Sequence, residues 1–105
     1  MHLGIELTNL KTEIVALRTV LTPIAPKSAL DKLESAEKDV QLAVGSVGSS
    51  LLTRAATNAD SAYDKLIEAL RVIDHPAYAE ATAQIPTLKR LINTMSTLIM
   101  RLAGL

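Results

Sequence analysis

The stretch LGIELTNLKTEIVALRTVL, residues 3–21, carries the most regular pattern in this sequence. Apolar residues recur in it at spacings of 4, 3, 4, 3 and 4, which is the heptad repeat of a helix that packs along one seam. The seam consists of Leu3, Leu7, Leu10, Ile14, Leu17 and Leu21. The pattern predicts one helix over residues 3–21, which ends where Pro23 and Pro26 interrupt helical hydrogen bonding.

Four charged residues flank this seam. Glu6 and Glu13 occupy heptad position g, and Lys11 and Arg18 occupy position e. In a parallel coiled coil, Glu6 would face Lys11 of a second copy. Glu13 would likewise face Arg18, whereas an antiparallel pair of these helices would set Glu against Glu. The charges therefore favour parallel self-association, and the alternative is that the helix packs inside its own bundle.

The rest of the chain also reads as helix. Leu and Ala dominate with 17 and 15 residues, Phe and Trp are absent, and no window shows the alternation of a strand. Further helices are predicted over residues 28–44, 51–73 and 86–103, the first of these three capped by Ser28. Residues 45–50, GSVGSS, predict a hairpin turn, although the apolar spacing through them also allows one long helix.

These elements predict a single all-α domain over residues 1–105, a small antiparallel bundle of about four helices. Residues 76–84 form either a short helix or an extension kinked at Pro86. Besides the seam, the predicted core comprises Leu30, Leu33, Val40, Val44, Leu52, Ala55, Ala59, Ala62, Leu66, Leu70, Ile73, Leu88, Leu91, Ile92, Met95, Leu98, Ile99 and Leu102.

Residues that could carry chemistry are few. The absence of Cys excludes disulfides, thiolate nucleophiles and Cys-based metal sites. Of the two histidines, His2 has Glu6 four residues on but lies at a terminus that is expected to fray, and His75 has no carboxylate three or four residues on, so neither predicts a metal site. Asp74 is the expected N-cap ahead of Pro76, and His75 is assigned to the same helix start. The sequence therefore predicts no enzyme, no metal and no cofactor.

Charges on the later helices suggest an internal contact. Asp60, Asp64 and Glu68 form one acidic stripe of the third helix. The stripe is most simply a solvated face with Lys65 and Arg71 close by, and it is also a reasonable docking surface for the last helix, which carries three basic residues and no acid. The basic residues, which are also candidate contacts to a partner or an anion, are Lys89, Arg90 and Arg101.

The overall charge limits the classes of partner. Lys and Arg balance Asp and Glu, so the chain has no net field to hold nucleic acid or an anionic membrane. The last helix is too short and polar to span a bilayer, and peripheral membrane contact is not expected. Charged residues scattered through the first 20 positions argue against a signal peptide, so we expect a cytoplasmic protein.

We therefore predict a non-enzymatic helical bundle that forms a homo-oligomer, such as a dimer, and binds another protein as an adaptor, chaperone, inhibitor or assembly component. The alternative is an oligomer that binds or sequesters a small ligand in a pocket between subunits, lined by Lys or Arg.

Overall fold

The computed structural model describes residues 2–104, and four α-helices without a strand make up this part of the chain. The helices are α1 (Leu3–Leu21), α2 (Lys27–Gly48), α3 (Leu52–Ile73) and α4 (Ile85–Ala103), with the short 3-10 helices η1 (Pro76–Tyr78) and η2 (Ala81–Gln84) between α3 and α4. The predicted all-α class and the number of helices are confirmed.

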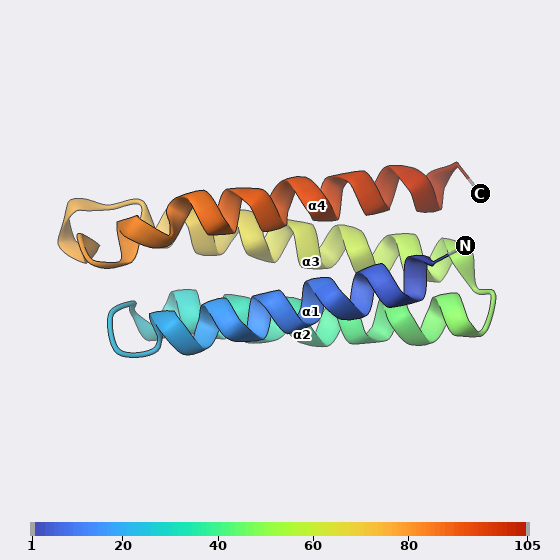
Figure 1. Ribbon diagram of the computed structural model, residues 1–105, viewed down its shortest axis with the longest axis horizontal. Coiled ribbons are helices and arrows are strands. Elements are labelled where there is room, and N and C mark those ends of the chain that lie inside the picture. The colour runs from blue at the N-terminus through green and yellow to red at the C-terminus, as the bar shows by residue number, and fades with distance from the viewer. Residues whose placement is uncertain (1, 105) are drawn as a thin grey trace.

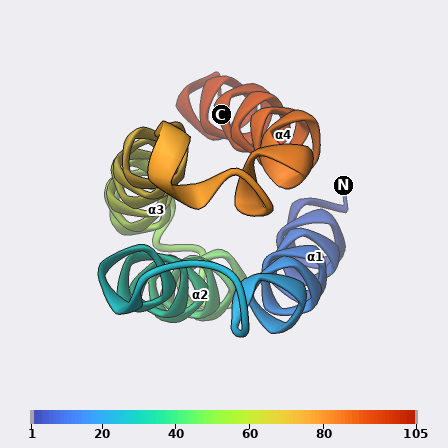
Figure 2. The same ribbon diagram turned by 90° about the vertical axis from the view of Figure 1, so that its left-hand side faces the viewer.

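The helices form an elongated bundle of 43 × 18 × 18 Å, in which successive helices run in opposite directions (Figure 1). Seen along the axis, α1, α2, α3 and α4 follow one another around a ring, so that α4 returns next to α1 (Figure 2). The start of α1, the end of α4 and the α2–α3 turn lie at one end of the bundle (Figure 1). The 3-10 helices and the α1–α2 loop lie at the other end.

The heptad seam of α1 points into the core, because all six of its apolar residues are at most 3% exposed. Most of the predicted core residues on the other helices are buried as well. The exceptions are half-buried at the margin of the core: Leu30, Val44, Leu52, Leu70 and Ile99.

Helices α2 and α3 have the most extensive mutual contact, and both carry small buried residues. Fully buried alanines on α2 recur once per heptad, and further buried alanines lie on α3. They are Ala29, Ala36 and Ala43 on α2, and Ala55, Ala59, Ala62 and Ala69 on α3. Such small side chains allow two helix axes to approach closely. The alanines of α2 and Ala69 were absent from the predicted core, as was the buried Ala81 of η2.

The hairpin between α2 and α3 lies later than residues 45–50 suggest. Helix α2 continues through both glycines to Gly48, and the chain reverses at residues 49–51. Ser50 takes the left-handed conformation, with φ of 60°, and Leu51 donates its N–H to the carbonyl of Ser46 at 2.8 Å. Half-buried Val44 and Val47 pack on the core, and this burial offsets the low helix propensity of the glycines.

Two predicted caps are replaced. Helix α2 begins at Lys27 after Pro26, and no side chain caps it, so Ser28 is not its N-cap. His75, rather than Asp74, caps η1, because its Nδ1 accepts a hydrogen bond from the N–H of Ala77 at 3.0 Å. The predicted helix-start role of His75 is confirmed, although Asp74 was assigned the cap itself.

Gly45 offers a test of the helical α2 terminus. A Cβ added there would meet nothing within 4 Å, and the residue lies inside a helix. We expect Gly45→Ala to raise the free energy of unfolding by about 0.5–1 kcal/mol, because alanine loses less conformational entropy in a helix. Urea unfolding followed by circular dichroism measures this change. A loss of stability would contradict a helix that is open to solvent at residue 45.

Candidate functional site

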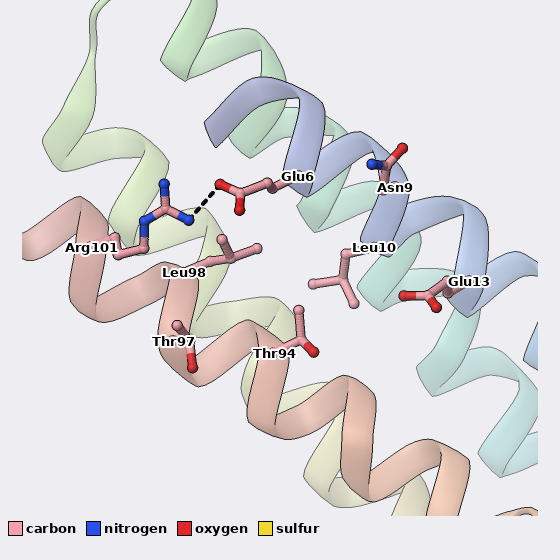
Figure 3. A pocket seen from close by; sticks show the side chains of 8 residues that line it. All are labelled: Glu6, Asn9, Leu10, Glu13, Thr94, Thr97, Leu98 and Arg101. Carbon is pink, nitrogen blue, oxygen red and sulfur yellow. Dashed lines mark hydrogen bonds and ion pairs between the residues drawn. The ribbon is translucent and has the colours of Figure 1, made fainter. Parts of the chain in front are cut away.

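The least extensive contact between neighbouring helices is that between α1 and α4, where the ring of the bundle closes. A groove of about 300 Å³ runs along this junction (Figure 3). Its lining residues are Glu6, Asn9, Leu10, Glu13, Thr94, Thr97, Leu98 and Arg101. Leu10 and Leu98 are both nearly fully buried, so they form the apolar floor, and the remaining groups are polar.

Two ion pairs bridge α1 and α4 across the groove. Arg101 donates to a carboxylate oxygen of Glu6 (Figure 3). Arg90 Nη1 donates to Glu13 Oε1 at 3.0 Å. All four side chains are 41–56% exposed, and exposed pairs of this kind contribute about 0–1 kcal/mol each. The pairs thus align the helices and neutralise both arginines, but they add little to stability.

The predicted docking of the last helix on the acidic stripe of α3 is wrong. Arg90 and Arg101 lie on the side of α4 that faces α1, and they reach the acids of α1 instead. Glu68 faces the other neighbour of α3, where its Oε2 lies 2.7 Å from Lys32 Nζ of α2. The hydrogen bond and the charge of Lys32 lower the pKa of Glu68. Among residues 2–104, Lys89 is exposed and forms no ion pair.

The other two charges of α1 are directed to α2. Lys11 Nζ donates to Gln41 Oε1 at 2.9 Å. Arg18 donates from Nε and Nη2 to the two carboxylate oxygens of Glu37, which is only 7% exposed. The hydrogen bond to Glu37 and its negative charge raise the pKa of Arg18.

These contacts replace the parallel pairing that the heptad charges favoured. The seam is buried inside the chain's own bundle, and each flanking charge contacts a neighbouring helix of the same chain. The internal alternative therefore describes this seam. Any association with a second copy must use another surface of the bundle.

The outward side of α1 offers such a surface. It was not singled out from the sequence, although the spacing of its residues can be found there. Side chains facing away from the core at spacings of 4, 3, 4 and 4 form a second stripe on α1, all of them exposed and uncharged. We call it the outer stripe: Ile5, Asn9, Thr12, Ala16 and Val20. Ile5 is 61% exposed and Val20 49% exposed. On α4, Met100 is 66% exposed, and it lies next to Arg101, the partner of Glu6.

The groove is poorly equipped for catalysis or metal binding. Its carboxylates, Glu6 and Glu13, are each held by an arginine, which disfavours their use as a general base. Across residues 2–104, no group of three or more His, Asp or Glu side chains is positioned to hold a metal ion.

Comparisons with protein-family models, curated proteins and solved structures find no match to this chain. None of the helices in the described range 2–104 has both the length and the apolarity to cross a membrane.

The two kinds of arginine pair should differ in their effect on stability. Arg18→Met leaves the carboxylate of Glu37 buried without its partner, which should cost about 1–3 kcal/mol of unfolding free energy. Arg101→Met removes an exposed pair, so we expect a loss of at most about 1 kcal/mol. Urea unfolding of both variants measures the difference.

A double variant controls for the contact itself. Arg18→Met combined with Glu37→Met removes both partners, so most of the lost stability should return. Equal losses in Arg18→Met and Arg101→Met would show that the Arg18 pair is no more important than a surface pair.

Proposed function

We propose that this protein is a non-enzymatic helical bundle that self-associates and binds another protein, as an adaptor, chaperone, inhibitor or assembly component. The observation that carries the proposal is the outward surface of α1, which is a full-length helix face without a single charge. Its four charged residues, Glu6, Lys11, Glu13 and Arg18, all lie beside neighbouring helices. Interface cores are depleted in charge in the same way.

The opposite side of the bundle differs in charge. The outward surfaces of α2 and α3 expose several acidic and basic residues, among them Asp31, Lys38, Asp60, Asp64 and Arg71. Two exposed leucines lie near the α2–α3 turn, each with a basic residue close by. Leu51 has Arg54 three residues on, and Leu42 lines a hollow with Lys38 and Lys11 on the α1 side of α2. Charged side chains favour hydration of the α2 and α3 surfaces, and the contrast with the uncharged outer stripe supports the outward side of α1 as the binding surface.

The small-ligand alternative has less support. It requires free Lys or Arg in a pocket between subunits, whereas Arg90 and Arg101 are neutralised by glutamates. The groove volume of about 300 Å³ is also at the lower limit for small-molecule sites. Only Lys89 of the three basic residues on α4 is left for an anion, and it lies outside the groove lining.

Two threonines allow a matched test of this surface. Thr12 on the outer stripe and Thr57 on α3 are both exposed, and each donates its hydroxyl to the carbonyl four residues earlier at 3.1 Å. Native mass spectrometry after gentle cross-linking in the host reports the companions of each variant. We expect Thr12→Glu to lose the proteins that co-purify with the wild type, because it places a charge in the contact. We expect Thr57→Glu to retain them.

The protein bound at this surface is either a second copy of the chain or another protein. The proposal is overturned if Thr12→Glu, folded by circular dichroism, keeps every companion of the wild type, or if the wild type has none.

A further inference from the structure

The side chains of the outer stripe are large at its two ends and small in between. Its large apolar residues, Ile5 and Val20, lie at the two ends, and smaller side chains, Asn9, Thr12 and Ala16, lie between them. Ile5 and Val20 are seven and eight residues from Thr12, so the stripe is close to symmetric about its centre. If a second α1 helix runs in the opposite direction with its Thr12 at the same level, Ile5 of each helix therefore lies close to Val20 of the other.

The hydroxyls on and beside the outer stripe already have partners within α1, whereas the amide of Asn9 has no partner among residues 2–104. The hydroxyl of Thr8 donates to the carbonyl of Gly4 at 2.8 Å, and that of Thr12 to the carbonyl of Thr8 at 3.1 Å. Thr19 bonds to the carbonyl of Val15 in the same way at 2.9 Å. Because these hydroxyls are satisfied within α1, the threonines can lose water without losing their hydrogen bonds.

We propose that the outer stripe is covered by the outer stripe of a second copy, with the two α1 helices antiparallel and related by a two-fold axis near Thr12. This inference rests on the proposed function and names the occupant of its surface. In this arrangement Ile5 packs on Val20 of the other copy at both ends, and Asn9 meets Ala16. The small central residues let the two helices approach closely.

Charge also favours a copy of the same surface as the occupant. An uncharged stripe cannot compensate the desolvation of charges on a partner, so it matches a partner surface that is equally uncharged. A second outer stripe meets this requirement, and the four charges of each α1 stay paired or hydrogen-bonded within their own bundle. The antiparallel arrangement does not depend on the charges at heptad positions e and g.

The available area suits a reversible dimer. Helix α1 has 19 residues and is therefore about 28 Å long. With the adjoining rim of α4, where Arg90 and Arg101 stay paired with the glutamates of α1, the bundle presents a face 18 Å wide. The footprint is about 500 Å² on each copy, and the total of about 1,000 Å² is near the lower limit of specific interfaces. We therefore expect the dimer to form in a concentration-dependent manner.

Site-directed disulfide cross-linking tests the arrangement, because the natural chain has no cysteine. The single variants are Ile5→Cys, Val20→Cys and Thr12→Cys, with Thr57→Cys as the control on α3. Under mild oxidation, a mixture of Ile5→Cys and Val20→Cys should give a cross-linked dimer several-fold faster than either variant alone. Thr12→Cys should cross-link with itself, and Thr57→Cys should not.

The other outcomes overturn the inference in different ways. Faster cross-linking of Ile5→Cys with itself than with Val20→Cys would show a parallel pair and overturn the antiparallel arrangement. Rates equal to that of Thr57→Cys at every position would overturn the second copy as occupant. In that case, companions that Thr12→Glu still loses would show that the surface binds another protein, so the proposed function would stand without this inference.

Discussion

The alanine-lined contact between α2 and α3 is the constraint on which the rest of the bundle depends. Because alanine side chains keep these two helices close, they form a tight antiparallel pair, and α1 and α4 pack beside them. The ring then closes between α1 and α4, the helices that are farthest apart along the chain. Their contact rests on a few larger residues, such as Leu10 and Leu98, with a groove above. The position of the groove thus follows from which helix pair is packed most closely.

Charge placement on α1 follows from its two neighbours in the ring. A helix in an antiparallel bundle has one neighbour on each side of its buried seam, so both charged flanks can be satisfied within one chain. The acidic flank, Glu6 and Glu13, meets arginines of α4. The basic flank, Lys11 and Arg18, meets Gln41 and Glu37 of α2. The same heptad geometry that would select a coiled-coil partner therefore selects the neighbouring helices, and it leaves the outward side of α1 without charge.

This separation of charged and uncharged surfaces is the basis of the proposed function. Pairs at the α1/α4 groove are exposed and contribute little stability, so the groove is no rigid pocket with free charges. The outer stripe beside it has exposed apolar ends, and its one hydroxyl, that of Thr12, is hydrogen-bonded within α1. A surface of this kind loses little on dehydration, which makes a protein partner a better fit to it than a charged small molecule.

The sequence by itself determined the helices, the approximate ends of each and the buried stripe of α1, because propensity and apolar period act between residues that are close along the chain. It also singled out the charges of the groove, Glu6, Glu13, Arg90 and Arg101, but it assigned them the wrong partners. Which acid meets Arg101 depends on the order of helices around the ring, and local pattern carries no information on that order. The choice of His75 over Asp74 as the cap of η1 is a local detail, a hydrogen bond between residues two apart, which the sequence pattern placed only to within one residue. Tertiary structure alone decided that the heptad seam packs inside the chain's own bundle, because such a seam can pack against helices of the same chain or of a second copy, and the local pattern is the same in both cases.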